Sequence, residues 1–405
     1  MINAQKRIAG KSLAWLLTLV YFSSYVTRIN FAAVIQEVVT ATGFSRTDLA
    51  VALTCLSTTY GFGQIVNGML GDRVKPQNLI LTGLLTATVI NFAFPFLASS
   101  PTLMAVLWGL NGFAQAMMWP PIVKILVATM DDNMYSYAVV RVSWGSSIGT
   151  IAVYMISPLL IGAFGWQGVF FFSAAIGAVV TLLWKFLRGG IDMQAPQQQS
   201  NVPAKARIPR KALFPMAFIA LGIIFQGMLR DGVTSWMPSY LSEIFNLGNQ
   251  TSIFCTVSLA IFGMVSYTVA TALYKRFFSN EVTCGGVIFI FSVVASLLLF
   301  FFFDGGAVLS ILLMATLTAC MHGINLMLIT HVPKRFKKYG NISTISGAVN
   351  ACTYIGSAIF TYAVAVLSES IGWQNTVGVW ALIALLGTAC CFIAAKPWKK
   401  FYQES

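Results

Sequence analysis

The chain has 405 residues, of which 57% are hydrophobic and only 9% are charged, and its mean hydropathy is +0.78. This composition lies well beyond that of a soluble globular domain, and it indicates a protein that crosses a membrane many times. Lysine and arginine outnumber aspartate and glutamate by 25 to 12, which gives a formal net charge of +13.

Apolar runs of roughly 20 residues, long enough for a helix to cross a bilayer, recur along the chain. They predict helices near residues 13–38, 48–70, 78–98, 102–127, 135–163, 167–187, 213–240, 251–273, 282–303, 307–331, 341–367 and 375–395. The expected fold class is therefore an all-α membrane protein with twelve transmembrane helices. The first run is too long for the apolar region of a cleavable signal peptide, so we expect it to remain as a helix.

The positive charges lie on one side of this topology. Arg28 and Arg230 fall inside predicted helices and Arg46 falls on the side assigned as external, so the remaining 22 of the 25 Lys and Arg lie on the opposite side. Because short cytosolic loops collect Lys and Arg, we expect a plasma (inner) membrane protein with both termini in the cytosol. This asymmetry accounts for the net charge, so binding to nucleic acid is not expected.

The chain also divides into two similar halves. Ser147-Ile-Gly149 precedes Trp166-Gln167, and Tyr354-Ile-Gly356 precedes Trp373-Gln374, at a constant offset of 207 residues. A Gln- and Pro-containing stretch followed by basic residues separates the halves and is typical of a linker. We expect two pseudo-symmetric six-helix bundles, at residues 1–187 and 213–405, joined by a cytosolic linker at 188–212. In such duplicated carriers the binding site lies between the halves near mid-membrane.

Two arginines lie deep within predicted helices. Arg28 is fifteen residues beyond Leu13, or roughly 22 Å along a helix, and Arg230 is seventeen residues beyond Leu213. An arginine at the centre of a membrane helix costs about 2.5–3.5 kcal/mol on insertion scales, which usually marks a function. The guanidinium fork matches the oxygens of phosphate or carboxylate and stays charged. We predict one central anion site, the alternative being that a structural partner neutralises each arginine.

The stretch Gly68-Met-Leu-Gly-Asp72-Arg73 ends the second predicted helix. It resembles the G-x-x-x-D-R signature of the major facilitator superfamily. In that superfamily the Gly permits close helix approach, and the Asp and Arg belong to a charge network that breaks when the inner gate opens. In the second half Lys275 and Arg276 stand at the matching place, but the aspartate is missing.

A closer resemblance appears when the arginines are taken with their neighbours. The motifs are Tyr25-x-x-Arg28-x-Asn30-Phe31, Gly43-Phe-Ser-Arg-x-Asp48-Leu49, Tyr60-Gly61-Phe62, Asn111-Gly112, Gln115-x-Met117-x-Trp119-Pro120-Pro121, Arg230-x-Gly232 and Trp236-x-Pro238-x-Tyr240-Leu241. In order and spacing they resemble the organophosphate:phosphate antiporter family, the glycerol-3-phosphate and hexose-phosphate transporters. The resemblance implies that Arg28 and Arg230 bind the phosphate.

Two positions depart from that family. Gln64 stands where well-known members have a lysine, and Trp144 stands at the place of a histidine. Losing a cation changes the electrostatics of a dry site considerably. The substrate could therefore carry less charge than a hexose phosphate, or the exchanged ion could differ from inorganic phosphate.

Further candidates are polar residues at helical spacing on faces that already carry a motif. Asp231, next to Arg230, is either a structural hydrogen-bonding partner or a proton-coupling group, since burial raises a carboxylate pKa and a nearby cation lowers it. The candidate substrate-binding residues beside the two arginines are Tyr25, Tyr60, Gln64, Gln115, Trp119, Trp144, His322, Asn325 and Tyr354. Such side chains also serve as contacts between helices.

The remaining chemistry is sparse. The seven cysteines are scattered through the spans and only two histidines are present, so we expect no disulfide frame, metal, cofactor or enzymatic activity. The function we predict is secondary transport of a small organic anion by alternating access, by a monomer in the lipid bilayer. The anion is a phosphorylated metabolite, exchanged for phosphate or coupled to protons. The alternatives are a proton-coupled symporter of a carboxylate such as a sugar acid, and a transporter-like anion sensor.

Overall fold

The structure, a computed structural model, describes residues 8–44, 46–191, 209–247, 255–339 and 341–403. These residues form helices and connections without a β-strand. Most of the linker expected at 188–212 lies outside the described residues. Contacts between residues group the chain into two compact units, one formed by Met1–Ala206 with Phe336–Ala348 and the other by Arg207–Arg335 with Val349–Ser405.

The first unit contains six of the predicted spans. Its helices are α1 (Gly10–Thr42), α2 (Arg46–Arg73), α3 (Pro76–Leu97), α4 (Pro101–Gln115), α5 (Trp119–Thr129) and α6 (Asp132–Leu187), followed by the 3₁₀ turn η1 (Arg188–Gly190). The single span predicted at 102–127 is broken between α4 and α5, where Pro120 and Pro121 begin the new helix. Proline is tolerated in a first helical turn because its missing N–H would have no helical partner there.

The second unit contains the other spans. Its elements are α7 (Arg210–Phe245), α9 (Val257–Phe277), α10 (Glu281–Phe301), α11 (Ala307–Asn325), the π-helical turn η2 (Leu326–His331), α12 (Val332–Lys334) and most of α13 (Ile342–Gln403). A 3₁₀ turn, η3 (Lys337–Tyr339), precedes α13 and groups with the first unit.

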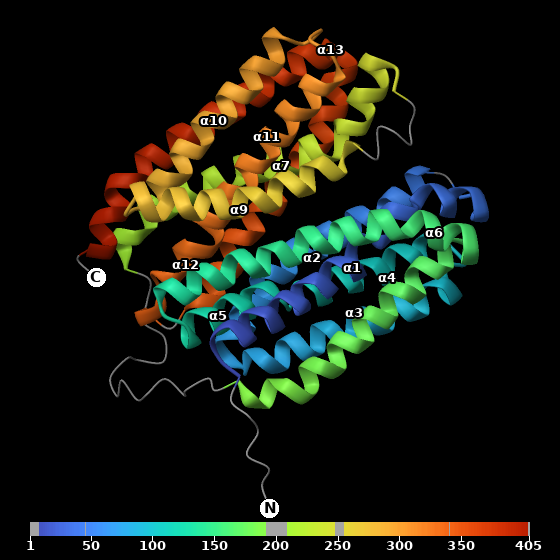
Figure 1. Ribbon diagram of the computed structural model, residues 1–405, viewed down its shortest axis with the longest axis horizontal. Helices are drawn as coiled ribbons and strands as arrows, with labels where there is room; N and C mark the ends of the chain where they lie inside the picture. Colours follow the sequence, from blue (N-terminus) through green and yellow to red (C-terminus); the bar gives the residue numbers. More distant parts are fainter. Residues whose placement is uncertain (1–7, 45, 192–208, 248–254, 340, 404–405) are drawn as a thin grey trace, which may run out of the picture. The chain divides into compact units, whose positions relative to one another are not determined.

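Two long helices each contain a pair of spans. Within α6, Gly165 has φ 67°, and within α13, Gly372 has φ 79°, so both glycines occupy a region that other residues rarely adopt. Figure 1 shows α6 doubling back on itself at its bend. With each of these helices counted as two spans and α4 with α5 as one, the described helices account for the twelve expected spans. Seven described helices are individually long and apolar enough to cross a membrane.

Aromatic packing holds the first unit together. Phe94 of α3 stacks on Phe170 of α6 with ring centroids 4.5 Å apart, and Phe31 of α1 lies 5.3 Å from Trp108 of α4. All four side chains are buried. The cluster fixes α1, the helix that carries Arg28, against three neighbours, and large aromatic contacts of this kind contribute strongly to packing.

An ion pair joins α10, α13 and the turn after α12 in the second unit. The Glu281 carboxylate is fully buried and accepts hydrogen bonds from Arg335 Nε and Nη2, both at 2.9 Å, and from Trp398 Nε1 at 3.0 Å. Burial alone would lower the pKa of Arg335, but the hydrogen bonds and the charge of Glu281 raise it above its usual value. The carboxylate therefore lies opposite a permanently charged partner.

We predict that Glu281→Ala lowers the stability of the carrier by about 1.5–3 kcal/mol, because it removes the charged hydrogen-bond partner of the half-buried Arg335. Unfolding in detergent measures the change. Glu369→Ala removes an exposed acid and should leave stability nearly unchanged. The double variant Glu281→Met/Arg335→Met should regain most of the loss, and a double variant as unstable as Glu281→Ala would contradict this interpretation.

Candidate functional site

Arg28 lies among aromatic rings in the first unit. Its side chain is only 9% exposed, and its Cζ atom lies 4.1 Å from the ring centroid of Tyr25 and 4.9 Å from that of Tyr60. Tyr21 extends this wall, because its ring lies 5.2 Å from Tyr25 and 5.0 Å from Trp119. Ring faces attract a guanidinium without a full negative charge. The two rings thus stabilise the guanidinium without adding a formal negative charge.

Amide side chains hold α1 behind Arg28. Asn91 of α3 and Asn111 of α4 each donate a hydrogen bond of 2.9 Å to the carbonyl oxygen of Thr27, and Asn30 donates to Asn91 at 2.7 Å. All of these side chains are buried. Sequence reasoning missed the role of Asn91, because helical spacing within one span gives no sign of a partner 64 residues away.

The side chain of Gln115, unlike those of the other candidates in the first half, forms hydrogen bonds to two side chains of α1. Its amide Nε2 donates to Thr27 Oγ1 at 2.9 Å, and its Oε1 accepts from Ser24 Oγ at 2.6 Å. The side chain therefore joins α4 to α1. In contrast, Trp119 is 4% exposed and its Nε1 has no hydrogen-bond partner among the described residues. This indole N–H is a donor available beside the aromatic wall.

Gln64 and Trp144 occupy different surroundings. Gln64 is fully buried, and its Nε2 lies 3.5 Å from the carbonyl oxygen of Ala116, at the break between α4 and α5. The ring of Trp144 lies 4.0 Å from Arg141 Cζ. The neighbouring Gly145 packs against Thr18, ten residues before Arg28. Trp144 therefore lies beside a part of α1 that precedes Arg28 by several helical turns. Its position in the sequence alone did not reveal this.

In the second unit, a carboxylate already occupies the fork of Arg230. Arg230 Nε lies 2.6 Å from Asp231 Oδ1, and Nη2 lies 2.8 Å from Oδ2. Ser357 of α13 also donates a hydrogen bond to Asp231 Oδ2. The Tyr354 ring centroid lies 5.7 Å from Arg230 Cζ. Asp231 is thus paired in the structure, and its partner is the neighbouring arginine.

His322 of α11 has a defined hydrogen-bonding position. Its Nδ1 lies 2.9 Å from the hydroxyl of Tyr267 on α9, and a Cβ at Gly263 would lie 2.8 Å from its ring. Asn325, one turn later, ends α11 at the start of the π-helical turn and is half-buried. Gln226, one turn before Arg230, is fully buried and donates to the carbonyl oxygen of Met321 at 3.1 Å.

Matching glycines determine where the helices that carry the two arginines cross their neighbours. A Cβ at Gly149 of α6 would lie 2.9 Å from the carbonyl oxygen of Phe22, six residues before Arg28. A Cβ at Gly356 of α13 would clash with the carbonyl oxygen of Ile224, six residues before Arg230. Each arginine therefore lies the same number of residues beyond a close crossing of equivalent helices.

The residues of the proposed inner gate lie at the end of α2. Asp72 accepts hydrogen bonds from the backbone N–H groups of Ser343 at 3.0 Å and Thr344 at 2.8 Å, and its Oδ1 lies 3.8 Å from Lys124 Nζ. A carboxylate at the first turn of α13 is favourable because N–H groups there lack helical partners. Gly68 packs against the same turn, since a Cβ there would lie 2.8 Å from the Ser343 carbonyl oxygen. Arg73 is exposed.

The two groups of residues around Arg28 and Arg230 share features that suit the binding of an anion. Each offers a guanidinium with an aromatic face, and the second adds a carboxylate beside a histidine. Among the described residues no group of three or more His, Cys, Asp or Glu side chains could hold a metal ion. Planar donor forks next to aromatic walls suit an anion with several oxygens.

Curated relatives include two carriers of phosphate esters. The chain is 25% identical to the glycerol-3-phosphate transporter of Bacillus subtilis, over 67% of this chain and 66% of the relative. It is 23% identical to a probable hexose phosphate transport protein of Chlamydia muridarum, over 62% of this chain and 61% of the relative. The matched regions thus span slightly less than two thirds of these relatives' lengths.

Solved structures and a family model agree on the architecture. A crystal structure of FucP, a major facilitator transporter in the outward conformation, superposes with a TM-score of 0.72 at 14% identity, over 94% of this chain and 98% of that chain. The family model of the Major Facilitator Superfamily matches residues 17–361. This match confirms the expected fold class, and the chain is a multi-pass membrane protein that belongs to the Major Facilitator Superfamily.

Proposed function

We propose that this protein is a secondary active transporter of a phosphorylated small metabolite. The observation that carries the proposal is the pair of deep arginines, each six residues beyond the same helix crossing in its own repeat. The curated relatives that transport glycerol 3-phosphate and hexose phosphate support this substrate class. Arg28 and Arg230 would bind one anion together, and the carrier would expose it to one side of the membrane at a time.

The anion would drive the conformational change through charge. Two guanidinium groups in a low-dielectric site repel each other and are poorly solvated. A phosphate ester with two negative charges offsets both effects, so the loaded carrier closes more readily than the empty one. The contact of Asp72 with the start of α13 would break and re-form during this cycle. The Lys- and Arg-rich side, with both termini, would face the cytosol.

The pairing of Arg230 with Asp231 would determine which ion is transported together with the substrate. While Asp231 is ionised, its carboxylate occupies both donors that Arg230 would offer to phosphate. Binding of a dianion then requires Asp231 to leave the fork, which protonation allows because a neutral carboxyl group no longer competes for the guanidinium. We therefore propose that a proton enters at Asp231 with the substrate, in place of exchange for inorganic phosphate.

The candidate residues divide into two roles. Tyr25, Tyr60, Trp119 and Tyr354 would line the anion with ring faces and N–H or O–H donors. Gln64, Gln115 and Trp144 would act in helix packing, as their contacts with Ala116, Thr27 and Arg141 suggest. His322 and Asn325 would line the second half of the site beside Asp231.

A carboxylate is the second candidate substrate. The observation that favours it is the same ion pair, because two arginines and one ionised aspartate leave a net charge that matches a single carboxylate. A sugar acid would then bind without displacing Asp231, and the carrier would be a symporter of a monoanion.

Counterflow in proteoliposomes separates these substrates. Vesicles loaded with glycerol 3-phosphate should accumulate the radiolabelled compound, and external phosphate esters should compete with it. Sugar acids should compete at least tenfold less well. The carboxylate alternative requires the reverse order, and that order would contradict the proposal for phosphate esters.

The same assay tests the two arginines. Arg28→Lys and Arg230→Lys should each lower uptake about tenfold to hundredfold, because lysine keeps the charge but loses the planar fork, and a hydrogen bond to a charged group contributes about 1.5–3 kcal/mol. Arg276→Lys, at an exposed helix end, should transport normally. Near-normal uptake by either variant at wild-type abundance would exclude that arginine from the anion site.

The proposed role of Asp231 predicts how substrate uptake depends on pH. Uptake should rise as external pH falls, because protonation of Asp231 frees the Arg230 fork. Asp231→Asn should bind substrate with a flat pH profile and should no longer move protons with it, as measured by a pH-sensitive dye inside the vesicles. His322→Gln, which changes the other titratable side chain of this cluster, should keep the wild-type slope. A wild-type slope in Asp231→Asn would assign the proton to another group.

A further inference from the structure

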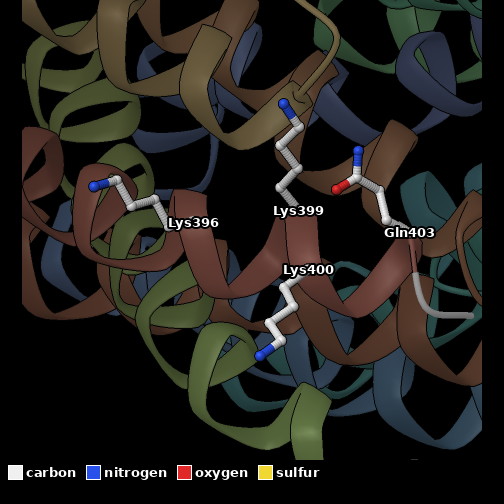
Figure 2. A pocket seen from close by; sticks show the side chains of 4 residues that line it. All are labelled: Lys396, Lys399, Lys400 and Gln403. Carbon is white, nitrogen blue, oxygen red and sulfur yellow. The ribbon is translucent and has the colours of Figure 1, made fainter.

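The polar side chains at the end of α13 do not converge on one point. A hollow of about 230 Å³ there is lined by Lys396, Lys399, Lys400 and Gln403. Figure 2 shows Lys399 and Lys400 pointing to opposite sides of the helix, so they do not form one binding face. The pair of Tyr267 and His322 in the same unit differs, because its contacts hold one ring in one orientation.

The ring of His322 is held by contacts between α9 and α11. Its Nδ1 lies 2.9 Å from the Tyr267 hydroxyl. The absence of a side chain at Gly263 makes room for the ring, since a Cβ there would lie 2.8 Å from its Cδ2 atom. Ser266, between these two residues of α9 in the sequence, donates a hydrogen bond to the carbonyl oxygen of Ala319. These contacts fix the two helices against each other and leave the imidazole little freedom to turn.

His322 also lies near the ion pair of Arg230 and Asp231. The charges of both residues act on the imidazole. Gln226, one turn before Arg230, donates a hydrogen bond to the carbonyl oxygen of Met321, the residue before His322. The His322 side chain is half-buried, and its Nε2 forms no hydrogen bond with a described residue. Nε2 is therefore the ring nitrogen through which His322 can contact a bound anion.

The contact with Tyr267 determines which nitrogen of the neutral ring carries the proton. A phenol is a stronger acid than a neutral imidazole, and an imidazole nitrogen is a stronger base than a phenol oxygen. These properties favour donation from the Tyr267 hydroxyl to Nδ1, which places the ring proton on Nε2. In this tautomer His322 presents an N–H donor without adding a positive charge to the membrane interior.

We propose that Tyr267 is a positioning residue that fixes the Nε2–H tautomer of His322, and that this N–H donates a hydrogen bond to a phosphate oxygen of the transported ester. This role rests on the proposed function, in which the anion displaces Asp231 from Arg230. Asp231 accepts from both Nε and Nη2 of that arginine, so an anion that enters the second unit first needs a donor that no carboxylate occupies. The imidazole N–H is such a donor.

Nitrogen NMR of the full-length protein in lipid vesicles measures the tautomer directly. The chain contains only two histidines, and the signals that disappear in His322→Gln belong to His322. At about pH 8, where an ordinary histidine is neutral, the wild type should show a bare Nδ1 and a protonated Nε2. Tyr267→Phe, which keeps the ring but removes the hydroxyl, should show a mixture of both tautomers. A protonated Nδ1 in the wild type would overturn the proposal, and so would an unchanged spectrum in Tyr267→Phe.

Uptake measurements test the contact with the substrate. Tyr267→Phe should raise the KM for glycerol 3-phosphate about threefold to tenfold, as expected for one misplaced hydrogen bond, and should leave the maximal rate nearly unchanged. His322→Gln, which keeps an amide donor near the place of Nε2, should raise KM less than His322→Leu. Equal KM values for these two variants would overturn the donor role. The control Tyr240→Phe removes another buried hydroxyl of this unit, which lies 3.3 Å from Ser310 Oγ, and should keep the wild-type KM and tautomer.

Addition of ligands to the NMR sample separates the role of His322 from the substrate class. Glycerol 3-phosphate should shift the Nε2 signal of the wild type. A shift with a sugar acid but not with glycerol 3-phosphate would support the donor role and overturn the proposed substrate class. No shift with either compound, at concentrations that saturate uptake, would overturn the donor role and leave the substrate class to the counterflow assay.

Discussion

The constraint on which this protein depends is the cost of placing an arginine in the middle of a membrane helix. The two repeats meet this cost differently. In the first unit, Arg28 lies against the rings of Tyr25 and Tyr60, which attract the cation but carry no net charge. In the second unit, Arg230 is held by the Asp231 carboxylate. In the function that we propose, Arg28 offers its positive charge to the ligand, whereas Arg230 stays paired until its carboxylate moves or takes up a proton.

This asymmetry gives the two repeats separate tasks within one binding event. The tyrosine rings beside Arg28 attract its guanidinium without adding a formal negative charge, which suits the role in anion binding that we propose for it. Arg230 is suited to report anion binding, because the incoming oxygens and Asp231 compete for the same fork. Ser357 adds a hydrogen bond from α13 to that carboxylate. A change in the charge of Asp231 therefore acts on two helices at once, which is the kind of local change that can bias a larger movement.

Sequence reasoning reached the spans, because a span depends on properties of a single helix, and it predicts how far along its helix each arginine lies. Length and hydropathy identify a span, and counting residues gives depth. Sequence reasoning could not identify the hydrogen-bonding and ion-pair partners of these side chains. Gln115 lies on the expected face of α4, yet its amide is used by Ser24 and Thr27. Glu281 follows Arg276 by five residues, yet its carboxylate pairs with Arg335, which is 54 residues away. Spacing along one helix determines a face, but the neighbour on that face depends on how separate helices pack.

The close helix crossings fix the heights of α1 and α7 against their neighbouring helices. Helices can approach until backbone meets backbone only where a glycine removes the Cβ atom, and such a contact fixes the height of one helix against the other. The crossing of Gly149 with Phe22 and that of Gly356 with Ile224 do this in the two repeats. A larger side chain at either glycine would push α1 or α7 away from its partner and shift its arginine relative to the rings or the serine around it. The chemistry of each half-site thus depends on a residue that carries no chemistry of its own.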